Sequence, residues 1–312
     1  MPSLPSSLQV LPPAQPATPV RGQGAAFASV LLIMGLLLAG DTSAAAQHGG
    51  SAASGDADPI LQIRSASALI IDDKGQRLYG KNTYQVKPIA SITKLMTAMV
   101  VLDAGAAMNT AITIVDQDRD RVRNSRSRLR IGEATLSRRE MLTVALMSSD
   151  NRAAAALART TFPGGTPRFV DAMNRKAQTL GMSDTWFADA TGLDNRNRST
   201  AEDLVKMIRA AAEYRLIREA TTRGELSVYP FAGAGPLEYR NTNPLVRNPN
   251  WHVELSKTGF INESGHCLVM QTRIGGRRLY VVLLDAVGKL TPVGDSNRLR
   301  TWLADGRRIA EN

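Results

Sequence analysis

Ser91 and Lys94 lie three positions apart in the apolar stretch SITKLMTAMVVLD. This spacing puts two side chains on the same face of a helix. A serine hydroxyl is a weak nucleophile unless a base lies within hydrogen-bonding reach. Lysine can be that base once burial or a nearby positive charge lowers its pKa. Because lysine is rarely buried without a reason, the pair predicts a serine nucleophile with lysine as its base.

A second polar motif, SDN, occupies residues 149–151 in the middle of a long helical pattern. The hydroxyl of Ser149 could relay a proton to a leaving amine, and the amide of Asn151 could hold a substrate carbonyl. Standing alone, the motif is better explained as a helix cap around Ser149 or as a polar interruption of the helix. The motif indicates a functional site only if other motifs of the same kind occur elsewhere in the chain.

The third motif, KTG, falls at residues 257–259 on a predicted strand. Alternation along the strand places Val253, Leu255 and Lys257 on one face, so that Lys257 is a second charge among apolar neighbours. Gly259 has no side chain to obstruct a ligand backbone that approaches the strand edge.

In this order, S-x-x-K, S-D-N and K-T-G form a set typical of class A β-lactamases and penicillin-binding proteins. The chain resembles the low-molecular-mass penicillin-binding proteins, in particular the D-alanyl-D-alanine endopeptidase branch (penicillin-binding protein 7 type). The resemblance extends to the segments ASITKLMTAMVVLDA, LSRREMLTVALMSSDNRAAAALAR, DATGLDNRNRSTAEDL and KTGFINESGHCLVM.

The resemblance implies a mechanism. Ser91 would attack the carbonyl of a D-alanyl peptide bond while Lys94 accepts its proton, and Ser149 with Lys257 would pass a proton to the departing amine. Water would then release the acyl group. In this scheme the two lysines depress each other's pKa, and because their titrations are coupled, the sequence leaves open which lysine is the base.

Substrate-binding residues also follow from the resemblance. Asn151 would orient Lys94 and the substrate amide, and the oxyanion would lie between the backbone N–H groups of Ser91 and Phe260. Thr258 and Gly259 would hold the substrate as an added antiparallel strand. No metal ion and no cofactor is implied.

The rest of the chain predicts the elements that must position these residues. Thr166 is expected to cap one helix, with Pro167 as its first residue, and a capping box of Ser199 with Glu202 is expected to start another. Predicted strands span residues 64–72, 77–82, 112–116, 252–260, 267–276 and 277–287, and predicted helices span 91–104, the two ends of 137–160, 166–181, 199–214 and 296–308. Strands at both ends with helices between them indicate an α+β fold, in which the N-terminal strands and the meander of the last three antiparallel strands share one sheet. By resemblance it is serine β-lactamase/DD-peptidase-like, an antiparallel sheet flanked by helices with an all-helical half.

The N-terminal region predicts export. Residues 1–46 contain Arg21, a sixteen-residue apolar run at 25–40 and a small-residue site at Ala44-Ala45-Ala46, which are the parts of a signal peptide. An uncleaved membrane anchor is the alternative. Residues 47–58 read as a flexible linker, and residues 59–312 as a single DD-peptidase catalytic domain with peripheral or no membrane association. The expected location is the periplasm.

The net charge of +10 favours an anionic neighbourhood such as the cell wall. An exported chain with 5% aromatic residues and no recognisable nucleic-acid module is not expected to bind nucleic acid. The basic loop, residues 118–132, is either a solvated loop or a contact for wall polymers; it carries six arginines, from Arg119 to Arg130. The single cysteine, Cys267, lies in an apolar run and is expected in the core.

The predicted function is a serine DD-peptidase that acts on the peptide stems of peptidoglycan, cleaves D-Ala–meso-diaminopimelate cross-links and binds β-lactams covalently. The alternative is a DD-carboxypeptidase that removes terminal D-Ala. A β-lactamase would need a deacylating Glu-x-x-Leu-Asn pattern after SDN, which the sequence lacks. A metallopeptidase is disfavoured because His48, His252 and His266 have no metal-ligand spacing. A non-catalytic penicillin-binding wall module would not need all the acylation residues.

Overall fold

The computed structural model describes residues 61–304. The predicted signal peptide, the linker, and the first two and last eight residues of the predicted catalytic domain lie outside this range, and with them the end of the predicted helix 296–308. Across residues 61–304, none of the helices has both the length and the apolar character needed to span a membrane.

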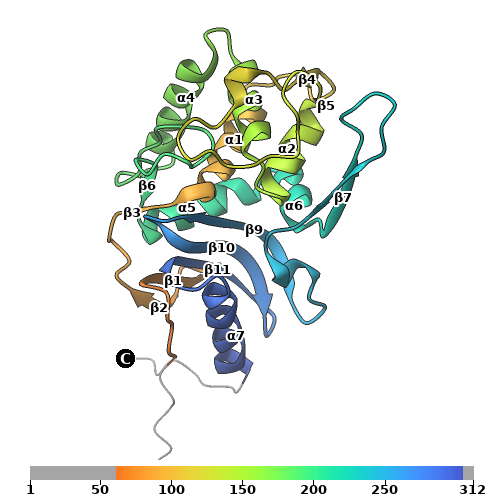
Figure 1. The fold of residues 1–312 in the computed structure, drawn as a ribbon. Helices are drawn as coiled ribbons and strands as arrows, with labels where there is room; N and C mark the ends of the chain where they lie inside the picture. Colours follow the sequence, from red (N-terminus) through yellow and green to blue (C-terminus); the bar gives the residue numbers. More distant parts are fainter. Residues whose placement is uncertain (1–60, 305–312) are drawn as a thin grey trace, which may run out of the picture. The chain divides into compact units, whose positions relative to one another are not determined.

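A five-stranded antiparallel sheet lies between two layers of helices (Figure 1). Its strand order is β2-β1-β11-β10-β9. The strands are β1 (Ser67–Asp72), β2 (Arg77–Lys81), β9 (His252–Ile261), β10 (Gly265–Ile274) and β11 (Arg277–Ala286). The pairing of β1 with β11 joins the N-terminal hairpin to the C-terminal meander, as predicted, and leaves β9 as an edge strand.

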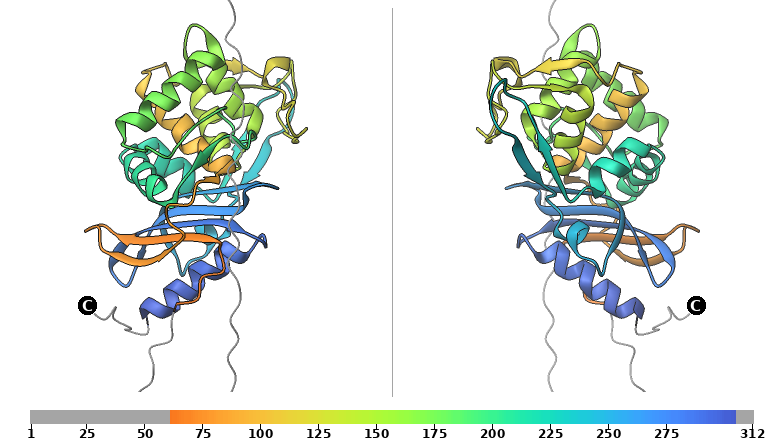
Figure 2. Two further views of the ribbon diagram at one scale, coloured as in Figure 1. Left: turned by 90° about the vertical axis from the view of Figure 1, so that its left-hand side faces the viewer. Right: turned by 90° about the vertical axis from the view of Figure 1, so that its right-hand side faces the viewer.

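Helices cover both faces of this sheet (Figure 2). The helical half, on one face, consists of α1 (Lys94–Asp103), α2 (Arg138–Met147), α3 (Asn151–Thr161), α4 (Gly165–Thr179), α5 (Ala201–Ala212) and α6 (Arg215–Thr222). The other face is covered by α7 (Thr291–Ala304), which begins five residues before its predicted start. The α+β architecture predicted from the sequence is confirmed.

Short elements connect the larger ones. They are the 3₁₀ helices η1 (Ala90–Thr93), η2 (Asp116–Asp118) and η3 (Pro244–Arg247), and the two-stranded ribbons β3 (Lys87–Pro88) with β6 (Arg198–Ser199), β4 (Ala111–Thr113) with β5 (Thr135–Ser137), and β7 (Glu225–Val228) with β8 (Leu237–Arg240). Of these, η1 matters most for function because it carries Ser91 directly into α1.

Alternation along the strands divides the core into two clusters. On β1, Leu69 packs against the helical half, whereas its neighbour Ile70 packs on the α7 side. In α1, the eight residues from Lys94 to Val101 are all buried. A helix that is apolar on all sides belongs in a core rather than at a surface, and α1 accordingly lies within the helical half (Figure 1).

Two predicted helix caps are wrong. Helix α4 begins at Gly165 after Gly164, whose φ of +94° is accessible to glycine at little cost, so Thr166 lies inside the first turn. Helix α5 is capped by Thr200, whose hydroxyl accepts the N–H of Asp203. The residue predicted for that cap, Ser199, pairs in β6 instead.

The acidic member of the predicted capping box has a different partner. Glu202 makes an ion pair with Arg77 of β2 at 2.6 Å. Because the cap is Thr200, one residue later than predicted, Glu202 is not the third residue after the cap and does not form a capping box. The misassignment arose because Ser199 and Thr200 are both good capping residues, and only the strand pairing of Ser199 decides between them.

The predicted alternation along β9 is also only partly correct. The pairing register with β10 shifts between Gln271 and Thr272, so that Leu255 pairs with Gln271 but Val253 pairs with Thr272. This irregularity inserts one residue into β9. Val253 therefore packs with the cluster on the α7 side, while Leu255 keeps the face toward the helical half.

Candidate functional site

A cleft of about 730 Å³ runs along the C-terminal half of β9, where the edge strand meets η1 and the loop between α2 and α3. Its lining includes six of the predicted site residues: Ser91, Ser149, Asn151, Thr258, Gly259 and Phe260. The other two, Lys94 and Lys257, are each 1% exposed and lie beneath the cleft. The structure thus brings all eight predicted residues to one place.

The junction of η1 and α1 brings the first serine–lysine pair together. The Nζ atom of Lys94 is 2.9 Å from Ser91 Oγ. It also donates to Asn151 Oδ1 at 2.7 Å and to the carbonyl of Thr191 at 2.6 Å. A neutral amine has two N–H groups and one lone pair. If the two carbonyl-type oxygens take the N–H groups, the lone pair faces the serine hydroxyl.

Burial sets the proton affinity of this amine. Removal from water lowers the pKa of Lys94 to about 8, while the carboxylates of Asp189 and Asp150 act in the opposite direction. Desolvation of a cation without a direct acidic partner favours its neutral form. With this pKa, about a tenth of Lys94 is the free base at pH 7, and the fraction rises at higher pH.

A second serine–lysine pair faces the first. Lys257 Nζ lies 2.9 Å from Ser149 Oγ and 2.8 Å from the carbonyl of Thr258. Burial first, and the positive charge of Lys94 second, hold the pKa of Lys257 well below its ordinary value. The repulsion between the two lysines, expected from the sequence, therefore lowers the pKa of Lys257 less than desolvation does. For Lys94, the neighbouring charges that shift the pKa are the carboxylates of Asp189 and Asp150, which raise it.

The break between α2 and α3 presents the second serine. Ser149 has φ +63°, an unusual conformation for a residue other than glycine. Asp150 then caps α3 by accepting the N–H of Ala153 at 3.0 Å. The helix cap anticipated in this motif is therefore Asp150, which leaves the Ser149 hydroxyl free to face Lys257.

Strand β9 passes very close to the nucleophile. A methyl group added at Gly259 would lie 2.9 Å from the Ile89 carbonyl and 3.2 Å from the backbone nitrogen of Ser91. Glycine is thus required for the approach of β9 to η1. The next residue, Phe260, is 53% exposed at the cleft and stacks on His266 with ring centroids 4.2 Å apart.

Thr258 is linked to a residue that sequence reasoning did not identify. Its hydroxyl donates to Thr242 Oγ1 at 2.6 Å. Thr242 and Asn243 both line the cleft from the loop that follows β8. The motif search missed this loop because its residues carry no reactive group and become relevant only by their position.

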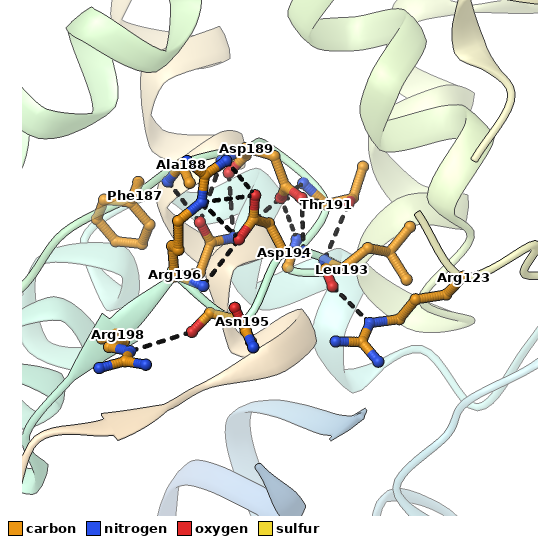
Figure 3. A network of polar contacts seen from close by, with 12 residues as sticks. Arg123, Phe187, Ala188, Asp189, Thr191, Leu193, Asp194, Asn195, Arg196 and Arg198 are labelled. Atoms are coloured by element: carbon orange, nitrogen blue, oxygen red, sulfur yellow. Dashed lines mark hydrogen bonds and ion pairs between the residues drawn. The ribbon is translucent and has the colours of Figure 1, made fainter. Parts of the chain in front are cut away.

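The loop of residues 187–198 was also missed as part of the site (Figure 3). Its Thr191 carbonyl is the acceptor for Lys94, and the Ala190 carbonyl accepts the hydroxyl of Thr97 in α1. A methyl group at Gly192 would lie 2.0 Å from the Ala90 carbonyl, so the loop also presses on η1. The available signal was the cluster of turn-forming residues in DATGLDN, which marks a tight loop without saying what it touches.

The basic loop (residues 118–132) is anchored to the second motif. The amide of Asn151 donates to Ser125 Oγ at 2.8 Å, and Ser127 Oγ donates to the Asp150 carboxylate at 2.8 Å. Arginines 121, 126, 128 and 130 are exposed, whereas these two serines are turned inward. The two interpretations made from the sequence, a solvated loop and a contact for wall polymers, concern only the exposed arginines of the basic loop. Its inner side, at Ser125 and Ser127, hydrogen-bonds to the second motif.

Two of the remaining polar candidates, His266 and Cys267, also line the cleft, but among the described residues no hydrogen bond joins either of them to the two serine–lysine pairs. Within residues 61–304, there is no group of three or more His, Cys, Asp or Glu side chains that could hold a metal ion. His252 and His266 lie on β9 and β10. Cys267 is buried in the core, and burial raises the pKa of its thiol to about 11.

Comparison with known proteins gives a consistent family. Residues 52–288 match a peptidase S11 family model described as D-alanyl-D-alanine carboxypeptidase. The chain is similar to a D-alanyl-D-alanine endopeptidase of Pseudomonas aeruginosa, with 47% identity over 254 residues that cover 81% of each protein. A D-alanyl-D-alanine endopeptidase of Escherichia coli is 44% identical over 251 residues, covering 79% of each.

A solved structure shares the fold. Penicillin-binding protein D2 of Listeria monocytogenes, in its ampicillin-bound form, superposes with a TM-score of 0.66 and 28% identity. The superposition covers 78% of this chain and 98% of that one.

Proposed function

Because this chain belongs to the D-alanyl-D-alanine carboxypeptidase family of serine peptidases, we propose that it is a serine DD-peptidase of peptidoglycan that works through an acyl-enzyme. We further propose that it is an endopeptidase for D-Ala–meso-diaminopimelate cross-links. The observation that carries the proposal is the 2.9 Å contact between the buried amine of Lys94 and the hydroxyl of Ser91. That contact supplies an activated nucleophile without a histidine.

In the proposed acylation step, neutral Lys94 takes the proton of Ser91 Oγ as this oxygen attacks the D-alanyl carbonyl carbon. The negative charge that develops on the carbonyl oxygen is held by the backbone N–H groups of Ser91 and Phe260. The close approach of β9 at Gly259 supports this role, because it brings the two backbone segments within contact distance.

Collapse of the tetrahedral intermediate breaks the scissile C–N bond. The leaving amine needs a proton, and the Ser149–Lys257 pair can pass one to it through the 2.9 Å contact between Ser149 Oγ and Lys257 Nζ. Lys94 then gives up the proton it took from Ser91 to the Ser149–Lys257 pair, which replaces the proton that left with the amine. Water then attacks the Ser91 ester, and the acyl product leaves with the serine regenerated.

The edge of β9 provides the binding track for the substrate. A peptide added antiparallel to β9 runs against the chain direction of this strand. With the scissile carbonyl at Phe260, its leaving half extends along Thr258 toward Thr242, and its acyl half extends toward the turn that follows Ile261. Asn151, held by Ser125, then faces the acyl half.

Endopeptidase activity is favoured over carboxypeptidase activity by the 47% identity to the Pseudomonas aeruginosa endopeptidase. Removal of terminal D-Ala from uncross-linked stems is the second candidate, and the description of the family model favours it. Rapid β-lactam hydrolysis is disfavoured because no glutamate is among the residues that line the cleft in the described part of the chain.

We propose that residues 1–46 direct export to the periplasm and are removed, that residues 47–58 form a linker, and that residues 59–312 form one catalytic domain. The small residues Ala44-Ala45-Ala46 support cleavage at this point. Mass spectrometry of the protein recovered from the periplasm is expected to show a mature N-terminus near residue 47. A protein that keeps residues 1–46 and fractionates with membranes would instead indicate an uncleaved anchor.

Acylation is tested with a fluorescent penicillin. Wild-type protein is expected to form a denaturation-resistant fluorescent adduct, and Ser91→Ala is expected to form none, because the hydroxyl at this position is the proposed point of attachment. Ser183→Ala serves as a matched control, since this serine is exposed and lies outside the cleft. Equal labelling of wild type and Ser91→Ala would exclude Ser91 as the nucleophile.

Specificity is tested with purified muropeptides. The enzyme is expected to convert cross-linked dimers to monomers faster than it removes terminal D-Ala from pentapeptide monomers. The two products are separated by chromatography in the same digestion series, with Ser91→Ala as the blank. Preferential loss of terminal D-Ala would assign the chain to the carboxypeptidase alternative.

A further inference from the structure

One carboxylate organises the loop that supplies the Thr191 carbonyl to Lys94. Figure 3 shows hydrogen bonds converging on Asp189 from residues that follow it in the chain. Its Oδ1 atom accepts the N–H of Thr191 at 2.8 Å and the N–H of Gly192 at 2.6 Å. Oδ1 also accepts the amide of Asn197 at 2.9 Å, and Oδ2 accepts the N–H of Asp194 at 2.9 Å.

These bonds close the loop upon itself. The side chain of Asn197 completes the closure from the other end, because its Oδ1 accepts the N–H groups of Ala188 and Asp189. Asn197 is fully buried and also donates to Thr93 Oγ1 of η1. The loop is therefore fixed both internally and against the segment that carries the nucleophile.

The position of the Thr191 carbonyl has a direct consequence for Lys94. Thr191 O and Asn151 Oδ1 accept the two N–H groups of the neutral amine, at 2.6 and 2.7 Å. The lone pair can face Ser91 Oγ only while both acceptors stay in place. Asn151 is a recognised member of the site, whereas the acceptor from Thr191 is a backbone atom whose position depends on the loop.

We propose that Asp189 is a positioning residue for the lysine base: by tying the loop of residues 187–198 together, it holds the Thr191 carbonyl on the Lys94 amine and so directs the amine's lone pair at Ser91. This inference rests on the proposed function, since it assigns a role to Asp189 only if Lys94 acts as a base. Asp189 itself does not contact the nucleophile or line the cleft.

The charge of Asp189 adds an electrostatic effect to this geometry. Three titratable groups face Lys94: Asp189 from the loop, Asp150 from the α2–α3 junction and Lys257 from β9. The two carboxylates raise the pKa of Lys94 against the larger effect of burial, which leaves it at about 8. Near Asp189, the cationic neighbour is Arg196, which pairs with Asp194 at 2.6 Å.

The test compares acylation rates of purified full-length variants from pH 5.5 to 9.5 with a fluorescent penicillin. Asp189→Asn keeps the Oδ1 acceptor but removes the charge and the acceptor for Asp194 N–H. The acid limb of its pH–rate profile is expected to move to lower pH by roughly 0.5–1 unit, because Lys94 loses a neighbouring negative charge. Its plateau rate is expected to fall about tenfold, because the base is less well aligned.

Two control variants separate charge from alignment. Asn197→Ala loosens the loop without changing any charge, so its plateau rate is expected to fall while its acid limb stays in place. Asp184→Asn removes an exposed carboxylate that lies outside this loop. Both its acid limb and its plateau are expected to match those of the wild type.

A second Asp189 variant keeps the test decisive if Asp189→Asn does not fold. Asp189→Glu retains the charge but displaces it by one methylene, so its plateau rate is expected to fall with the acid limb unchanged. Melting curves confirm that each variant compared is folded. A folded Asp189→Asn with the wild-type limb and plateau would overturn the inference, and so would an Asp189→Glu that folds and reacts at the wild-type rate.

Failure of the proposed function gives a different result. If Ser91 is not the nucleophile, the wild-type protein forms no Ser91-dependent adduct, whatever residue occupies position 189. If only the role of Asp189 is wrong, wild-type labelling depends on Ser91 and the position-189 variants leave the pH–rate profile unchanged.

Discussion

At the scale of single residues, the site consists of two lysine amines that are both withdrawn from water. Lys94 contacts Ser91, and Lys257 contacts Ser149, each at 2.9 Å. Neither amine makes an ion pair with a carboxylate among the described residues. Burial without such a partner is costly in the charged form, and this is the property that makes a lysine useful as a base.

The pH dependence of acylation follows from this burial. Because the neutral form of Lys94 is the base and its pKa is about 8, the acylation rate is expected to rise with pH and to level off above this value. Below about pH 7 the rate should fall about tenfold for each pH unit. A penicillin-acylation profile measured on the wild type from pH 5.5 to 9.5 checks the sign. A rate that falls as the pH rises from 6 to 8 would contradict a neutral lysine base.

Substitution of the same lysine by arginine separates base chemistry from positive charge. Lys94→Arg is expected to reduce acylation by at least a thousandfold, because a guanidinium stays protonated at any working pH. Lys74→Arg is the matched control at an exposed position in the turn between β1 and β2. Measurable acylation by Lys94→Arg at a tenth of the wild-type rate would show that the position needs only a cation.

At the scale of elements, the contact between β9 and η1 aligns the track for the substrate with the nucleophile. The two segments meet at Gly259 with no room for a side chain. Ala90, directly before Ser91, has φ +45°, an uncommon conformation for a residue with a side chain. Strain of this kind persists where packing on several sides enforces it, here from β9 and from the loop at Gly192.

Gly259→Ala tests this contact. The added methyl group would lie 2.9 Å from the Ile89 carbonyl, so β9 or η1 must shift, and a shift of this kind is expected to reduce acylation about a hundredfold. Gly235→Ala is the control, because nothing lies within 4 Å of its added methyl group. The rates are measured with the same penicillin, and melting temperatures report on folding. Acylation of Gly259→Ala at the wild-type rate would show that β9 and η1 can move apart without loss of activity.

At the scale of the whole molecule, a buried carboxylate ties the two ends of the described chain together. Asp295 of α7 is fully buried and accepts the backbone N–H groups of Arg64 and Ser65, both at 2.8 Å. It also accepts the hydroxyl of Ser65 at 2.6 Å and pairs with Arg298. The segment before β1 is thereby joined to the last described helix across the α7 face of the sheet.

Loss of this carboxylate is expected to destabilise the fold without altering the chemistry. Asp295→Ala leaves buried N–H groups without acceptors, which predicts a loss of about 3 kcal/mol in unfolding free energy. Urea denaturation measures this loss, and acylation per folded molecule is expected to stay at the wild-type level. Glu133→Ala is the control, because its ion pair with Arg130 is exposed and contributes little. A denaturation midpoint unchanged in Asp295→Ala would contradict the role of this link.

The sequence by itself determined the features that depend on local spacing. The i, i+3 spacing of Ser91 and Lys94 is enough to place both groups together once a helix forms there. The helix break at Ser149 and the antiparallel C-terminal meander also follow from local patterns. Local patterns predicted the wrong residue where two neighbours, Ser199 and Thr200, could each cap the same helix.

Only the tertiary structure decided which distant groups meet. Lys257 and Ser149 are 108 residues apart in the chain, and Lys94 reaches the Thr191 carbonyl across 97. A main-chain carbonyl has no signature in a sequence, because every residue has one. The burial that brings the pKa of Lys94 to about 8 is likewise a property of packing from several elements at once, so no single stretch of residues encodes it.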